Sequence, residues 1–280
     1  MIGARYETSS GETFDLSGQA SRSGLSGNEY KGWELTRSGR AFERQRRSVK
    51  ATMSFAGETS EARERAMRLF ELCDLDALSQ SPGRLWVGDW YLECYVSAGD
   101  CSYMWPHGVS YDVTLACDEM VWRRETVTEF MPWSASTIVN DQLDYSYDYP
   151  HDYGMTASLG GTIDVPGTEP CDFRITVYGY AASPYVRIGG NVYQVNVTVP
   201  DGGLLTIDST RRKSMAGDAV VVRDMYGNAT NAFPKRLRGY EGSGTYIFQR
   251  VSPGRNDVSW PQGFGFSLTL IERRGRLPWT

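Results

Sequence analysis

Alternating apolar and polar residues mark strands most clearly in the second half of this chain. In the segment 193–199, YQVNVTV, the odd positions are apolar and the even positions polar, which is the pattern of a half-buried strand. Gly189-Gly190 precedes this segment and can supply the positive φ values of a tight hairpin turn. The pattern therefore predicts a hairpin at the glycine pair and one strand through residue 199.

Similar runs continue to the C-terminus. Residues 173–177 and 266–270 alternate in the same way, and β-rich runs at 220–223 and 245–251 lie between them. Turn signals recur about every ten residues, as in sandwiches and barrels. This half is therefore predicted to be a galectin-like or jelly-roll β-sandwich.

One segment of the first half has the helical period instead. Apolar residues at positions 62, 66, 69, 70 and 73 fall on one helix face, and Thr59 or Ser60 can cap its start. These features predict a helix from about Ser60 to Ser79, ended by Pro82-Gly83.

The stretch after this helix, GRLWVGDWYLECYVSAGD, indicates a hairpin that turns at Gly88-Asp89. A further alternating strand runs from Tyr111 to Cys117. The first half is therefore predicted to be an α+β domain, a small sheet or barrel packed by one helix. The fold class of the whole chain is mainly β.

The character of the sequence changes near residue 130, and 280 residues are enough for two separate cores. We predict an N-terminal ring-forming domain at 1–130, a connector at 131–155 and the sandwich at 156–280. The connector contains YDYPHDYG, whose low complexity and proline favour an extended segment. Its candidate contacts with its own or a neighbouring subunit are Tyr145, Tyr147, Tyr149 and Tyr153.

Charge argues against a nucleic-acid partner. The chain carries a net charge of -5, with 15 basic and 20 acidic residues up to Phe130 and 14 of each afterwards. A local basic run is the exception, and we interpret it as a subunit contact or a solvated strand face; it comprises Arg40, Arg44, Arg46, Arg47 and Lys50.

No membrane partner or export signal is expected. The longest purely aliphatic run, Ala219 to Val222, is far too short to cross a bilayer. The first residues, MIGARYETSSGETFD, lack the apolar core of a signal peptide. The five cysteines form no Cys-x-x-Cys pair, and we expect them to be buried free thiols in a reducing compartment.

Catalytic chemistry has few candidates. His107 lies in a Pro-Gly turn and His151 in the connector, so neither a triad nor a zinc site is predicted, and no cofactor is expected. A glycosidase needs only two carboxylates. Acids such as Asp201, Asp208 and Asp257 have ordinary explanations in turns and on strand faces.

Several quoted segments together resemble the distal tail proteins of long-tailed, siphovirus-like bacteriophages. They are GETSEARERAMRLF, GRLWVGDWYLECYV, YDYPHDYG, CDFRITVYGYAASPYVRIGGNVYQV, LLTIDS and VSPGRNDVSWPQGFGFSLTLIERRGRLPW. They occur in the family's order and span nearly the whole chain. No single segment is specific, but the series is.

The resemblance implies a structural protein of the virion tail tip without catalytic activity. It implies a hexameric ring, made by the N-terminal domain, that joins the tail tube to the tail-associated lysin and receptor-binding apparatus. The expected partners are copies of itself, the tail tube protein, the lysin or hub protein and the tape measure protein. It implies synthesis in the bacterial cytoplasm.

Two alternatives remain open from the sequence. One is a carbohydrate-binding adsorption module that uses the C-terminal sandwich, with Trp260, Tyr185 or Tyr226 as sugar-stacking rings. The chain has no obvious inserted carbohydrate-binding domain, which counts against this alternative. The other is a tail-associated glycan hydrolase.

Overall fold

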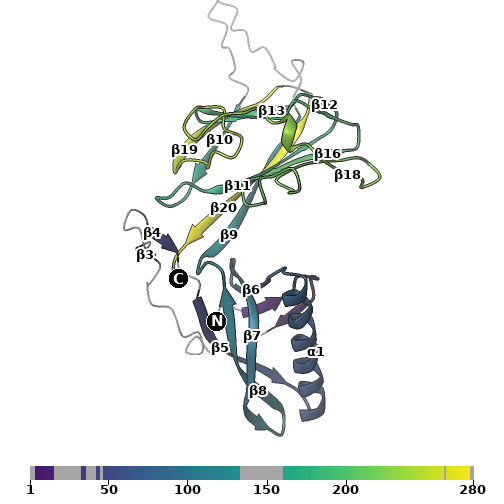
Figure 1. Ribbon diagram of the computed structural model, residues 1–280, viewed down its shortest axis with the longest axis vertical. Helices are drawn as coiled ribbons and strands as arrows, with labels where there is room; N and C mark the ends of the chain where they lie inside the picture. The colour runs from purple at the N-terminus through teal and green to yellow at the C-terminus, as the bar shows by residue number, and fades with distance from the viewer. Residues whose placement is uncertain are drawn as a thin grey trace, which may run out of the picture. The chain divides into compact units, whose positions relative to one another are not determined.

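The structure is a computed structural model, and it describes residues 4–15, 33–35, 42–44, 47–132, 160–261 and 263–277. The chain forms two compact units, drawn in Figure 1. Unit 1 comprises Met1–Glu125 and Arg273–Thr280, and unit 2 comprises Thr126–Glu272. Residues from Arg273 onward thus group with unit 1, although their sequence pattern continues that of the second half.

Unit 1 contains strands and one α-helix. In chain order they are β1 (Ala4–Glu7), β2 (Thr13–Asp15), β3 (Trp33–Leu35), β4 (Phe42–Arg44), β5 (Arg47–Ala56), α1 (Thr59–Leu78), β6 (Gly83–Val87), β7 (Trp90–Trp105) and β8 (Gly108–Cys117). Strand β9 (Trp122–Phe130) begins in unit 1 and ends in unit 2.

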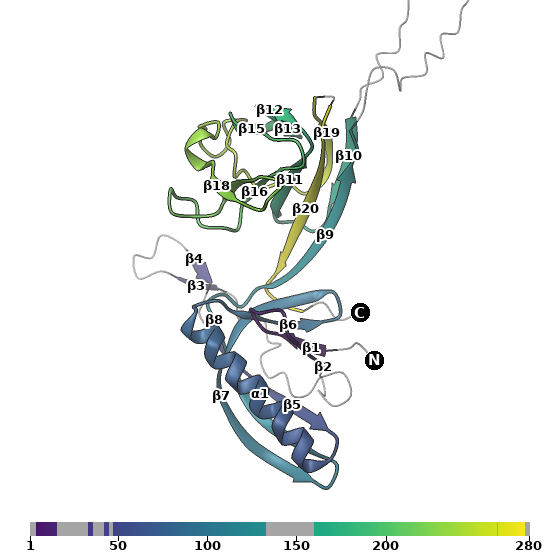
Figure 2. The same cartoon turned by 90° about the vertical axis from the view of Figure 1, so that its right-hand side faces the viewer.

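All strand pairs of unit 1 are antiparallel. The first part of β7 pairs with β6 and β9, and β6 continues the sheet through β1 to β2. The second part of β7 pairs with β8, which pairs with β5 along its whole length. Helix α1 contacts β5, β7 and β8, and Figure 2 shows it lying across these strands. The predicted small sheet packed by one helix is confirmed.

Helix α1 buries the predicted apolar face, including Ala62, Ala66, Leu69 and Cys73. The predicted cap is wrong, because the N-cap position is Glu58 and no side chain caps the helix. The Thr59 hydroxyl instead donates to the carbonyl oxygens of residues 105 and 106, at 3.2 and 3.1 Å. A tertiary contact therefore takes the hydroxyl that the sequence pattern assigned to the cap.

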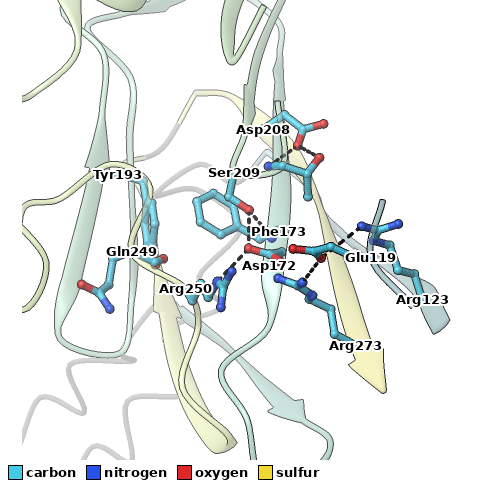
Figure 3. Close-up of polar contacts among 11 residues, drawn as sticks. Glu119, Arg123, Asp172, Phe173, Tyr193, Asp208, Ser209, Gln249, Arg250 and Arg273 are labelled. Carbon is cyan, nitrogen blue, oxygen red and sulfur yellow. Dashed lines mark hydrogen bonds and ion pairs between the residues drawn. The ribbon is translucent and has the colours of Figure 1, made fainter. Parts of the chain in front are cut away.

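The core of unit 1 lies between α1 and the strands, and it includes Leu277 from the C-terminal end. Nearby, Arg273 donates to the Glu119 carboxylate at 2.5 Å, and Arg123 lies 3.9 Å from the same carboxylate; both contacts are drawn in Figure 3. Two segments separated by about half the chain therefore complete one unit.

Unit 2 is built almost wholly of strands. They are β10 (Gly160–Val165), β11 (Asp172–Tyr178), β12 (Ala181–Ala182), β13 (Tyr185–Ile188), β14 (Asn191–Gln194), β15 (Thr198–Val199), β16 (Leu204–Asp208), β17 (Val220–Arg223), β18 (Ala229–Asn231), β19 (Gly254–Ser259) and β20 (Gly265–Arg274), whose last residues return to unit 1, together with the 3₁₀ helix η3 (Phe233–Lys235).

Two antiparallel sheets share the core of unit 2. One has the order β18-β17-β16-β11-β20 and the other β10-β19-β13-β14. The alternating residues of β11 and β20 point into this core, where Phe173, Ile175, Phe266 and Leu268 are fully buried. The predicted β-sandwich is confirmed, as is the mainly β fold class; the galectin-like assignment stays a prediction.

Two predictions in this half are wrong. The strand predicted over 193–199 is broken, because β14 ends at Gln194 and the Val197 N–H bonds to the Val195 carbonyl in a tight turn. Residues 245–251 form no strand, and only Val251 makes an isolated bridge, to Cys171. The apolar residues of both stretches that reach the core are buried there, and their burial explains the apolar positions without a regular strand.

Candidate interaction surfaces

The three-stranded sheet β5-β8-β7 of unit 1 has two long open edges. Strand β5 pairs with β8 from Arg47 to Ala56 and with no other described strand. The part of β7 from Tyr95 to Trp105 also pairs only with β8 within the described residues. Each edge presents a row of backbone N–H and C=O groups that can pair with another strand.

The outer part of β7 is exposed on both faces. Eight consecutive residues of β7, Ser97–Met104, are exposed, whereas a strand in a half-buried sheet hides every second side chain. Tyr103 and Met104 near the turn are 67% and 43% exposed. Exposed aromatic and methionine side chains are typical of protein interfaces. The sequence signal was present, since SAGDCSYM lacks the alternation found elsewhere in the chain.

Small polar side chains cover one face of this sheet. The Ser54 and Ser110 hydroxyls lie 2.6 Å apart, and Thr52 donates to Asp112 at 2.8 Å. The neighbouring residues Met53 and Phe55 point to the other face and are buried. On this polar face Ser110 is buried, whereas Asp112 is exposed.

A second surface of unit 1 is a cross-strand row of charged and aromatic residues. Arg5, Trp86, Tyr91 and Arg123 stand opposite one another on β1, β6, β7 and β9. The Arg5 guanidinium lies 4.7 Å from the Trp86 ring centroid, and Trp86 donates to Glu7 at 2.6 Å. Since Trp86 also lies 4.8 Å from Tyr91, ring to ring, its faces are already in contact within the unit. An open cavity of about 440 Å³ lies beside Arg5 and Trp86.

The polar and charged side chains of this row have hydrogen-bond partners within the same sheet. Tyr91 donates to Glu125 at 2.8 Å, and Arg123 donates to Glu93 at 2.6 Å. Burial, followed by the nearby Glu125 carboxylate, raises the pKa of Tyr91 above its ordinary value. These contacts satisfy the polar groups internally, so the row is best interpreted as part of the sheet's structure.

The buried carboxylates of unit 2 have structural partners, which Figure 3 shows. Asp172 accepts from Arg250 at 2.9 Å and from Ser209 at 3.4 Å. Asp208 accepts from Arg174 at 2.8 Å and from Thr210. Each of the two carboxylates thus binds an arginine side chain. These two acids are therefore arranged to hold strand ends.

The thiols differ in exposure. All five cysteines are free; four are buried as predicted, but Cys101 on the β7–β8 hairpin is exposed. Burial raises the pKa of Cys73 to about 12 and that of Cys171 to about 11. A hydrogen bond from Cys94 lowers the pKa of Cys117. Within the described residues, no group of three or more His, Cys, Asp or Glu side chains is arranged to hold a metal ion.

The residues proposed as subunit contacts are only partly described. Arg44 ends β4, Arg47 begins β5, and Lys50 lies on β5 with an exposed side chain. Arg40 and Arg46 lie outside the described residues, as do Tyr145, Tyr147, Tyr149 and Tyr153. The structure thus places Arg47 and Lys50 together on one open strand.

The three aromatic residues considered for sugar stacking differ in accessibility. Trp260 packs edge-on against Phe130 and Phe266 at 5.3 and 5.2 Å, and its indole N–H donates to the Phe264 carbonyl. Tyr185 is 40% exposed, and Tyr226 is 81% exposed in the β17–β18 turn. In the described part of the chain, no helix is both long and apolar enough to span a membrane.

Comparison with known proteins gives matches in structure alone. No protein-family model matches the sequence, and no curated protein does. The Dit protein (gp 19.1) of phage SPP1, a paradigm of the hub adsorption apparatus in phages that infect Gram-positive bacteria, matches with a TM-score of 0.55. That match has 10% sequence identity and covers 97% of this chain and 99% of that one.

Two chains from the phage P2 baseplate in its activated conformation match as well. The calcium form gives a TM-score of 0.57 and the strontium form 0.53, each at 12% identity and over 99% of this chain and 100% of that one. At such low identity, the likeness establishes the fold. From end to end, this chain folds as these phage adsorption-apparatus and baseplate chains do.

Proposed function

We propose that this chain is a distal tail protein, a structural protein of a phage tail tip. Unit 1 forms a hexameric ring that joins the tail tube to the tail-associated lysin and receptor-binding apparatus. The end-to-end likeness to phage hub and baseplate chains supports the tail-tip role. The sixfold number and the partners, which include the tube, lysin and tape measure proteins, follow from the sequence resemblance.

The observation that carries the ring is the pair of open edges on one three-stranded sheet. The edge of β7 in one copy can pair with the edge of β5 in the next copy. Because the two edges differ, this contact is head-to-tail, and such a contact closes into a ring when the rotation per copy divides a full turn. Pairing would also protect edges that otherwise invite aggregation.

The basic run adds charge to one side of the same contact. Arg47 and Lys50 lie on β5, and acidic side chains beside β7 of the next copy are the proposed partners of the exposed Lys50, which shares its face of the strand with Thr52. Asp100 and Asp112 occupy opposed positions on β7 and β8 and are both exposed. We propose that the connector tyrosines contact a neighbouring subunit as well.

A non-catalytic role accords with the contacts of the buried acids, since Asp172 and Asp208 each form an ion pair with an arginine. We also propose that the protein is made in the host cytoplasm without a signal peptide and resides in the virion. The sugar-binding alternative loses support at Trp260, whose ring packs within unit 2. Activity on cell-wall glycans would support the hydrolase alternative.

Light scattering on the full chain tests the ring. We expect a mass six times that of the 31.3 kDa chain. The double variant Tyr103→Asp, Met104→Asp places two negative charges on the exposed outer part of β7. It should reduce the mass to that of the monomer, because burying unpaired carboxylates in a contact has a high desolvation free energy. Tyr226→Asp, on an exposed turn of unit 2, is the matched control and should stay assembled.

Two results would contradict the proposal. A monomer at all accessible concentrations would remove the ring. Assembly lost in Tyr226→Asp but retained in the hairpin variant would move the contact from unit 1 to unit 2. Circular dichroism of each variant distinguishes a lost contact from a lost fold.

A further inference from the structure

A compact region of unit 2 carries a strong positive charge, although the chain as a whole is acidic. Between residues 209 and 250 there are eight Arg or Lys residues and three Asp or Glu residues, against a net charge of -5 for the whole chain. Five of these cations define a cationic ridge: Arg212, Lys213, Lys235, Arg236 and Arg238. Within the described residues, none of the five forms an ion pair with a carboxylate.

A buried pair of rings holds two of the cations in place. Phe248 is 4% exposed and stacks on Phe233 with centroids 6.0 Å apart. The Lys213 ammonium lies 5.1 Å from the Phe248 centroid, and the Arg236 guanidinium lies 3.8 Å from the Phe233 centroid. These contacts connect two loops that are far apart in the sequence.

The backbone on both sides of the rings is also fixed. Asn231 donates to the carbonyl oxygens of Ser214 and Met215 at 3.4 and 2.9 Å and also binds that of Gly217, which ties the Lys213 loop to β18. Next to η3, Arg236 donates to the Phe233 carbonyl at 2.7 Å and forms a β-bridge with Val195. Since Lys213 and Arg236 are already held by these contacts, binding an anion to these two side chains costs less side-chain entropy than on an ordinary solvated face.

The form of the ridge indicates what it can bind. Three of its five cations are arginines, whose planar guanidinium groups suit bidentate binding of phosphate. The two rings of the pair are covered, Phe248 by burial and Phe233 by Arg236, so neither can stack a base or a sugar, whereas Tyr240, two residues from Arg238, is 76% exposed. A protein interface needs an apolar centre with few charges, and the ridge offers charge instead.

We propose that the cationic ridge binds a flexible phosphate-linked polymer on a cell surface, through contacts between the five cations and successive phosphodiesters. The inference that the ligand carries phosphate groups rests only on the side chains of the ridge. The choice of a cell-surface polymer over DNA rests on the proposed function, because a tail tip meets a cell surface.

Binding of fluorescent inorganic polyphosphate to the full chain tests the proposal. We expect log K to fall with log salt concentration with a slope of about -3.5 for five contacts. The variant Lys213→Glu, Arg236→Glu should bind at least tenfold more weakly, and its salt dependence should be weaker, with a slope of about -2. The matched control Arg187→Glu, Arg255→Glu reverses two exposed cations of unit 2 outside the ridge, and it should change affinity less than about twofold.

A second variant separates binding from ring packing. Arg212→Glu, Arg238→Glu leaves both cation–ring contacts in place and should also weaken binding about tenfold or more. No binding at low salt, or equal losses in the ridge and control variants, would overturn the proposal. Tighter binding of poly-glutamate would assign the ridge to an acidic protein, and tighter binding of a DNA duplex would replace the cell-surface polymer. Ring assembly is measured separately, so the two proposals can fail independently.

Discussion

The edge strands of the two units differ in their length and in whether neighbouring chain covers them. Among the described strands of unit 1, β5 has one edge unpaired over ten residues, and the outer part of β7 has another. In unit 2, the edge strand β18 has three residues. Strand β14 is covered by neighbouring chain, because Val192 donates to the Gly244 carbonyl and Leu237 donates to the Gln194 carbonyl.

The edge strands of unit 2 are therefore short or covered, apart from the six-residue β10, which pairs only with β19 among the described strands, whereas the open edges of unit 1 are longer. A long exposed edge normally carries features that prevent pairing, such as proline, bulges or very short length. Strand β5 has neither proline nor a register shift in its pairing with β8, although it carries the charged Lys50, and the pairing of β7 with β8 shifts register at two places. We therefore expect changes in unit 2 to affect stability and changes at the edges of unit 1 to affect assembly.

Phe173→Ala should have the largest effect of the variants that test this difference between the units. Its ring is fully buried in unit 2 and packs edge-on against Tyr193 at 4.8 Å, so its loss should cost about 3–5 kcal/mol of unfolding free energy. Hydrogen exchange measured by mass spectrometry should show faster exchange in unit 2 only. Tyr226→Ala, at an exposed site, should change stability by less than about 0.5 kcal/mol. Equal loss of protection in unit 1 would show that the units do not unfold separately.

Leu277→Ala should destabilise unit 1 in spite of its position near the C-terminus. The side chain is 8% exposed and belongs to the core of unit 1, which predicts a loss of about 2 kcal/mol. The control is Leu204→Ala, a leucine of unit 2 that is 40% exposed. Exchange that increases in β5 to β8 would support the prediction, whereas a change confined to β10 to β19 would assign the C-terminal residues to unit 2.

Charge reversal on β5 should have the smallest effect. Arg47→Glu, Lys50→Glu should weaken assembly by about 1 kcal/mol for each exposed ion pair lost, without unfolding either unit. Added salt should weaken the unmodified assembly in the same direction, through screening. The control Arg187→Glu, Arg255→Glu makes the same change in net charge on unit 2. Assembly that ignores both salt and charge reversal would exclude the basic run from the contact.

Local signals predicted much of the fold. The hairpin turns at Gly88-Asp89 and Gly189-Gly190 were found because glycine is placed where the turn needs it, and Gly189 has a φ of 57°. The face of α1 followed from its period. These features depend on residues close in sequence, and the alternating or helical pattern records which side is buried.

Features that depend on distant partners were missed. Residues 245–251 have the composition of a strand, but Ile247 and Phe248 are buried while their backbone turns, with Gln249 bonded to the Tyr246 carbonyl. The cationic ridge was missed because Lys213 and Arg236 meet only through two stacked rings. The place of Leu277 in unit 1 was missed for the same reason. A sequence pattern indicates that a residue is buried, but it does not indicate in which of the two cores the residue lies.

The split composition of unit 1 also bears on the order of biosynthesis. All of unit 2 leaves the ribosome before Arg273 and Leu277 of this sequence, so the sandwich can fold while the core of unit 1 still lacks its last strand end. The unit with the open edges is therefore completed last.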